Sequence, residues 1–142
     1  MSKILQQETQ FTDIDIVRQA LEQQGFSPVY DENYAERVMQ GYAGQTFKAN
    51  LGVTRANFLA VTKIGTYGDL GFRSNSDGSV GFTGDDLLIN KPQFTEIMSG
   101  ITGAYAEKKY TKELNQSGFS LSTRNVLANG EVELNFVPMA GY

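Results

Sequence analysis

Hydrophobic and polar positions alternate most clearly over residues 45–54, where apolar side chains at every second position are separated by polar residues or glycine. A period of two is typical of a strand with one buried and one solvated face. Three weaker patterns predict further strands over residues 3–11, 27–31 and 57–64. Pro28 cannot donate to a ladder, which favours a sheet edge for its strand. Residues 32–40 fit no single pattern and stay unassigned.

Apolar residues recur at three- and four-residue steps in two other segments, which predicts two amphipathic helices. The first covers residues 13–24. Thr12 and Asp15 have the spacing of an N-terminal capping box, and Gly25 suits the position after a helix end.

The second helix is the long one. It begins at Pro92, a residue favoured in the first helical turn, and runs toward Leu114 before Gly118. Gly100 and Gly103 lie inside it and lower its propensity by roughly 1 kcal/mol each relative to alanine. We therefore expect this helix to pack closely against a neighbouring backbone.

Two hairpins complete the predicted elements. Residues 69–73 and 79–83 flank an Asp-Gly turn, and residues 119–127 and 131–137 flank an Asn-Gly turn. The order is strand, helix, several strands, helix and hairpin. It predicts an α+β fold, with a mainly antiparallel sheet and two helices packed on one face. The reverse face of the sheet is then open to a partner.

Composition supports one folded domain over residues 1–142 and excludes several kinds of site. The chain is 40% hydrophobic and 20% charged, as globular proteins are. It has no Cys and no His, which removes thiolate nucleophiles, imidazole bases and the usual zinc ligands. Asp77, Asp85 and Asp86 would gather a divalent ion only if their loops converged. We predict no metal and no cofactor, and binding is favoured over catalysis.

The charge pattern argues against a nucleic-acid partner. The chain has 12 Lys and Arg against 16 Asp and Glu, a formal net charge of −4. Its basic residues are scattered and form no stripe that could displace phosphate counterions. The N-terminal residues lack a secretory signal, and no apolar run is long enough to cross a bilayer. We expect a soluble cytoplasmic protein without membrane insertion.

Three glycine-containing segments carry a family resemblance: GYAGQTFKANLGV at 41–53, DLGFR with the following Asn and Asp-Gly at 69–78, and ITGAYA with the later Gly-Phe at 101–119. Together they resemble the hypothetical chloroplast reading frame 35 family, over about residues 3–136. That family occurs in plastid genomes, cyanobacteria and some of their phages, and its biochemical role is not established. The resemblance implies a plastid stroma or a phage-infected host as further settings.

This sequence departs from the family pattern in two places. A longer connection covers about residues 55–68, and Gly84, Asp85 and Asp86 stand where the family often has an aromatic segment with tryptophan. These differences indicate a divergent member.

Polar and amphipathic residues gather in the segments that carry the resemblance, and they form the predicted binding surface: Tyr42, Gln45, Lys48, Asp69, Arg73 and Tyr105. Tyrosine and arginine are enriched at protein interfaces. We predict a small interaction, assembly or regulatory domain that binds a protein partner or itself, including through a sheet edge. The alternative is an anionic small molecule held by Lys48 and Arg73 beneath residues 55–68. A surface Asp69–Arg73 ion pair without a binding role is a further interpretation.

Overall fold

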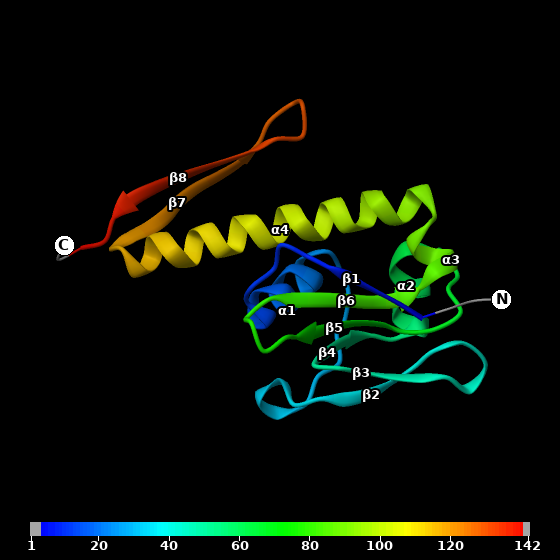
Figure 1. The fold of residues 1–142 in the computed structure, drawn as a ribbon. Coiled ribbons are helices and arrows are strands. Elements are labelled where there is room, and N and C mark those ends of the chain that lie inside the picture. The colour runs from blue at the N-terminus through cyan, green and yellow to red at the C-terminus, as the bar shows by residue number, and fades with distance from the viewer. Residues whose placement is uncertain (1–3, 141–142) are drawn as a thin grey trace. The chain divides into compact units, whose positions relative to one another are not determined.

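A computed structural model describes residues 4–140, and its elements are labelled in Figure 1. Backbone contacts divide the chain into two compact units, Met1–Tyr105 and Ala106–Tyr142. Each unit is described by itself below, and the single domain predicted from composition stays a prediction. No helix in the described part of the chain is long and apolar enough to span a bilayer.

The first unit is built on a four-stranded antiparallel sheet in the order β1-β6-β5-β4. These strands are β1 (Ile4–Glu8), β4 (Leu51–Val53), β5 (Leu70–Ser74) and β6 (Val80–Asp85). The predicted hairpin is confirmed, since β5 and β6 pair up to Ser74 and Val80. Gly78 in their turn has φ +89°, the left-handed conformation that an Asp-Gly turn supplies.

One face of this sheet is covered by α1 (Ile14–Gln23) and by the first part of α4 (Pro92–Gln116). Their apolar stripes and the sheet share one core of aromatic and aliphatic side chains, which include Val17, Leu21, Phe72, Phe82, Phe94 and Ile101. The α+β class with helices on the sheet is thus confirmed. The helix count is not two, because α2 (Arg55–Thr62) and the short α3 (Asp86–Ile89) were not predicted.

The N-terminal cap of α1 differs by one residue from the prediction. The Asp13 carboxylate accepts hydrogen bonds from the backbone N–H groups of Asp15 (3.1 Å) and Ile16 (3.3 Å), so Asp13 and not Thr12 is the N-cap. Gly25 follows the helix with φ +94°, as expected for a glycine after a helix end.

The strand predicted over residues 57–64 is wrong, because most of this segment is α2. The Thr54 hydroxyl accepts a hydrogen bond from the Asn57 N–H at 3.2 Å and caps the helix. Phe58 is buried, and Val61, three residues later, also packs against the core. A cap and two apolar residues at helical spacing that pack on the core therefore favour a helix in this segment.

The strand predicted over residues 45–54 is two strands. β3 (Thr46–Ala49) pairs with β2 (Arg37–Gln40), while β4 joins the main sheet. Asn50 lies between them, and its side chain donates to the Tyr34 carbonyl (2.8 Å) and accepts from the Ser74 N–H (2.8 Å). The strand predicted over residues 27–31 is reduced to one bridge from Val29 to Gly52.

The β2–β3 hairpin covers part of the sheet face that was expected to be open. A Cβ atom built on Gly71 in β5 would lie 2.7 Å from both Phe47 and Ala49 of β3. One built on Gly52 would lie 2.2 Å from the end of Met39 in β2. Because these side chains rest on the backbones of β4 and β5, the expectation of a free reverse face is wrong there. The 3₁₀ turn Glu32–Tyr34 precedes this hairpin, and a second 3₁₀ turn, Tyr42–Gly44, connects its two strands.

The second unit holds the last turns of α4 and the hairpin of β7 (Phe119–Val126) and β8 (Val132–Pro138). Both predicted elements are confirmed. α4 starts at Pro92 and ends at Gln116, and Gly118 has φ +92°. The hairpin turn contains Gly130 at φ +86°, and the ladder is irregular between Leu121 and Thr123.

Candidate interaction surfaces

One exposed member of the predicted surface, Tyr42, contacts an exposed tyrosine that the prediction did not include. Tyr42, in the turn between β2 and β3, meets Tyr67 edge to face with ring centroids 5.2 Å apart. Tyr42 is 37% exposed and Tyr67 is 50% exposed, and Gln45 is exposed in the same turn. These residues form a small exposed aromatic group on the first unit.

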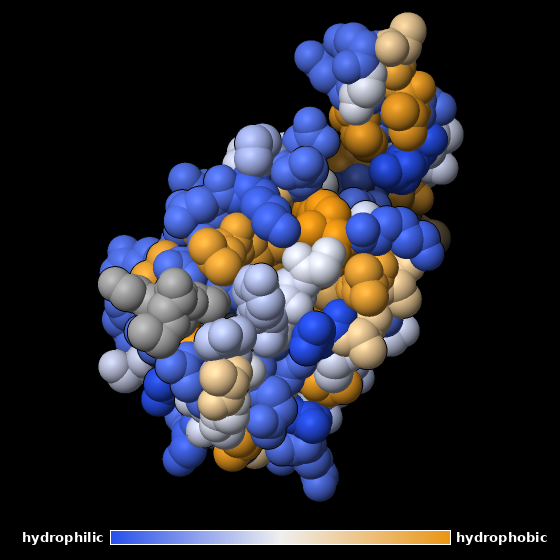
Figure 2. All heavy atoms as spheres, turned by 90° about the vertical axis from the view of Figure 1, so that its right-hand side faces the viewer, coloured by the Kyte–Doolittle hydropathy of each residue, from blue (hydrophilic) through white to orange (hydrophobic). Residues whose placement is uncertain are grey.

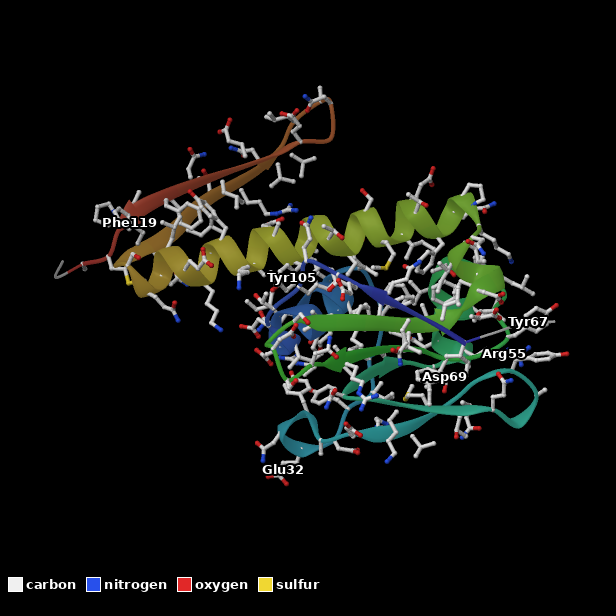
Figure 3. The ribbon with its side chains drawn as sticks, in the orientation of Figure 1. Glu32, Arg55, Tyr67, Asp69, Tyr105 and Phe119 are labelled. Atoms are coloured by element: carbon white, nitrogen blue, oxygen red, sulfur yellow. The ribbon has the colours of Figure 1, made fainter. Side chains whose placement is uncertain are left out.

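Asp69 connects two elements of the first unit through hydrogen bonds to their backbones. Its carboxylate accepts hydrogen bonds from the backbone N–H groups of Gln40 (2.9 Å) and Arg55 (2.8 Å), and its own N–H donates to the Gln40 carbonyl (2.8 Å). It thereby joins the end of β2 to the N-terminus of α2, and Figure 3 shows Asp69 beside Arg55. A negative charge at this helix end is also stabilised by the helix dipole.

Lys48 and Arg73, the cations of the anionic-ligand hypothesis, have different surroundings. Phe47 and Ala49 face the sheet, so Lys48 between them points away from it. Arg73 forms an ion pair with Glu36 at 3.2 Å. The segment proposed as a roof is largely α2, whose buried residue, Phe58, belongs to the core on the helix-covered side.

Tyr105 is 6% exposed and belongs to the core of the first unit. Its ring lies 4.4 Å from that of Phe11, measured between centroids, and its hydroxyl accepts from the Thr12 N–H at 2.9 Å. Figure 3 shows Tyr105 apart from Asp69. Whether the exposed members of the predicted surface bind a partner stays a prediction.

The carboxylates considered for a metal ion do not converge. Asp77 lies in the turn between β5 and β6 and accepts hydrogen bonds from Ser79, which lower the pKa of its carboxyl group. Asp85 stands at the other end of β6, where it accepts from the N–H groups of Tyr67 (3.2 Å) and Leu87 (2.9 Å). Both carboxylates serve local backbone geometry.

A three-residue network ties α1 to the turn before β2. The Tyr34 hydroxyl donates to Asp15 at 2.5 Å and accepts from the Arg18 Nε at 2.7 Å. The donated bond holds the pKa of the Asp15 carboxyl group below its usual value, and the Tyr34 hydroxyl raises that of Arg18. The pKa of Tyr34 is raised to about 12, chiefly by burial and to a lesser extent by the hydrogen bond to Asp15.

The surface that sequence reasoning missed is on the C-terminal hairpin. Residues opposite one another in an antiparallel ladder point to the same side of it. By register, one side of β7–β8 carries Phe119, Leu121, Arg124, Val126, Val132, Leu134, Phe136 and Pro138. We call this set the hairpin apolar face. The other side is mostly polar, with Ser120, Thr123, Asn125, Glu133, Asn135 and Val137.

The second unit covers this face only in part. Tyr110 of α4 meets Phe136 edge to face at 5.6 Å, and Glu107 of α4 binds Arg124 at 2.5 Å. That ion pair holds the pKa of the Arg124 guanidinium above its usual value. Leu121 remains 38% exposed, while Val126 is 62% and Val132 is 40% exposed. Figure 2 shows hydrophobic side chains at the surface of this hairpin, near the top of the view.

The alternation of apolar and polar residues in β8 is visible in the sequence, and it predicts the hairpin correctly. It does not predict that the apolar side stays open. Apolar alternation normally marks a side that a core covers, and the extent of cover depends on contacts distant in sequence.

A family model described as a protein of unknown function, DUF1257, matches residues 20–135. The match runs from within α1 to within β8 and includes all of α4 and β7. No curated protein and no solved structure matches the chain. The chain belongs to the DUF1257 family of proteins of unknown function.

Proposed function

We propose that this protein is a non-catalytic assembly domain that associates with a second copy of itself through the hairpin apolar face. The observation that carries the proposal is the exposure of Leu121, Val126 and Val132 on one side of a two-stranded hairpin. A two-stranded hairpin is only marginally stable in water unless its apolar side is packed. Here α4 packs on part of that side, at Phe136 and Arg124. Fully burying a valine or leucine side chain contributes about 1.5–3 kcal/mol.

Charge favours a second copy as that layer. Arg124 is the one charged residue of the hairpin apolar face, and Glu107 neutralises it at 2.5 Å. Two copies of the face can therefore meet in a symmetric interface without like-charge repulsion.

The cellular setting belongs to the same proposal. We place the protein in the cytoplasm of a cyanobacterium, in a plastid stroma or, for a phage-encoded copy, in the host cytoplasm. This setting rests on the sequence resemblance to the hypothetical chloroplast reading frame 35 family. A regulatory or assembly role in such cells would use the self-associated form.

The test replaces valine by threonine, which keeps the branched shape and strand preference while adding a hydroxyl group. The double variant Val126→Thr, Val132→Thr should weaken self-association at least about tenfold, a loss of about 1.4 kcal/mol. The matched control is Val137→Thr, on the polar side and 46% exposed, which should leave association unchanged. Light scattering over a concentration series gives the mass of each protein. A wild-type protein that stays monomeric throughout, or a control that dissociates equally, overturns the proposal.

A further inference from the structure

The first unit contains a groove of about 700 Å³ beside β1. Its floor is apolar and comes from the core side of the sheet, from α3 and from the first half of α4: Phe11, Phe82, Ile89, Phe94 and Met98. Its rim is polar, with Gln7, Glu8 and Thr95 among the lining residues. In Figure 1, β1 is the dark blue strand that runs below α4. An apolar floor with a polar rim and this volume is typical of a binding site.

β1 forms one edge of the sheet, since its only partner among the described strands is β6. A Cβ built on Gly81 of β6 would lie 3.6 Å from the Gln7 carbonyl oxygen, so that carbonyl points toward β6. Peptide groups of an antiparallel edge strand alternate between the partner and the open side. Gln6 and Glu8, on either side of Gln7, therefore direct their N–H and C=O groups away from the sheet.

These unpaired groups define the chemistry of an occupant. Donors and acceptors that repeat every second residue along a strand are matched by another extended backbone. Side chains at alternate positions of that backbone would then point onto the apolar floor of the groove. Met98 is suited to such a floor because its unbranched side chain adapts to different shapes.

The charge of the groove further restricts which peptides can bind it. Glu8 is the one charged residue among those that line the groove, and it is exposed. A Lys or Arg on the incoming strand would be attracted to it, while an acidic residue would be repelled. The net charge of −4 acts in the same direction at longer range.

We infer that this groove binds an extended peptide segment of another protein, which adds to β1 as a fifth strand, is apolar at alternate positions and carries a basic residue near Glu8. The site uses the sheet edge of the first unit, so it does not depend on the hairpin apolar face.

The experiment selects short random peptides, displayed on phage, for binding to the full-length protein. Selected peptides are then titrated against variants by fluorescence anisotropy. Gln6→Pro removes the outward N–H of position 6 without removing a bond to β6, and proline is tolerated at such edge positions. Gln6→Ala keeps that N–H and is the matched control. Glu8→Lys reverses the rim charge without altering the backbone.

The inference predicts selected peptides with alternating apolar residues and at least one Lys or Arg. Their affinity should fall about tenfold or more with Gln6→Pro, stay within about twofold with Gln6→Ala, and fall about tenfold with Glu8→Lys. If Gln6→Pro lowers the melting temperature, it perturbs the fold, and the inference is then tested by the Glu8→Lys titration alone. No enrichment, equal binding to wild type and Glu8→Lys, or a preference for acidic peptides overturns it.

Discussion

The Tyr105 hydroxyl connects α4 to the start of α1. It accepts hydrogen bonds from the backbone N–H groups of Thr12 at 2.9 Å and Asp13 at 3.2 Å, while its ring packs on Phe11. Tyr105→Phe keeps the ring and removes only the acceptor. We expect it to lower the free energy of unfolding by about 0.5–1.5 kcal/mol for each bond lost, measured by urea denaturation.

The control for this substitution is Tyr110→Phe. Tyr110 is 53% exposed and contacts Phe136 through its ring, so losing the hydroxyl should change stability little. Equal effects of the two substitutions would show that the Tyr105 hydroxyl does not stabilise the α1 terminus.

Ionisation of Tyr34 should make the free energy of unfolding depend on pH in the alkaline range. Its pKa is raised to about 12 in the folded protein, chiefly by burial and then by the bond to Asp15. In the unfolded chain the pKa of a tyrosine is about 10. A group whose pKa is higher in the folded protein than in the unfolded chain stabilises the fold. This stabilisation is complete below the pKa of the unfolded chain, and it is lost as pH rises through the pKa of the folded protein.

We therefore expect the stability difference between wild type and Tyr34→Phe to shrink as pH rises from about 10 to about 12. Urea unfolding at a series of pH values measures it, and the other tyrosines contribute equally to both proteins. A difference that stays constant over this window would contradict the role assigned to Tyr34.

At the scale of elements, two glycines should respond to alanine in opposite directions. A Cβ on Gly71 would lie 2.7 Å from Phe47 and Ala49, whereas one on Gly103 in α4 meets no atom within 4 Å. Gly71→Ala should destabilise by about 1–3 kcal/mol because it separates the β2–β3 hairpin from the sheet. Gly103→Ala should stabilise by about 0.5–1 kcal/mol, since alanine favours helix.

Thermal and urea unfolding of both variants measure this contrast. If Gly71→Ala were neutral, the β2–β3 hairpin would not be packed on β5 as the structure has it. If Gly103→Ala were destabilising, a neighbour would have to occupy the space beside that residue.

Elements with local signals could be predicted from the sequence, and those fixed by distant contacts could not. Gly78 and Gly130 identify their hairpins through turn chemistry, and Pro92 identifies the start of α4. α2 was missed because its identity depends on the burial of Phe58 against core residues that are distant in sequence. The cover over β4 and β5 was missed because it requires β2 to pair with β3.

The same distinction applies to the candidate sites. The alternation of apolar and polar residues predicts an exposed strand position for Lys48, as the structure has it, because this pattern is local in sequence. It did not distinguish the buried Tyr105 from an exposed tyrosine, because both suit the apolar stripe of a helix. The open side of the β7–β8 hairpin and the groove beside β1 arise from what the fold leaves uncovered.

At the scale of the whole molecule, the two units differ in how well they bury their apolar residues. The core of the first unit includes Phe72 and Phe82, each 1% exposed, whereas Val126 and Val132 in the second are 62% and 40% exposed. This contrast is the physical basis for the proposed assembly through the hairpin apolar face. It predicts that the second unit gains stability from a second copy, so that the melting temperature rises with protein concentration.

The most direct test measures the distance between two hairpins. The chain has no cysteine, so Glu133→Cys introduces a single position for a nitroxide label on the polar side of β8. Pulsed electron paramagnetic resonance should then show a defined distance between labels on two copies. At protein concentrations near the dissociation constant, the amplitude of this signal should fall in the added Val126→Thr, Val132→Thr background. Absence of intermolecular coupling in the labelled protein, or coupling of the same amplitude after both threonine substitutions, would contradict assembly through this face.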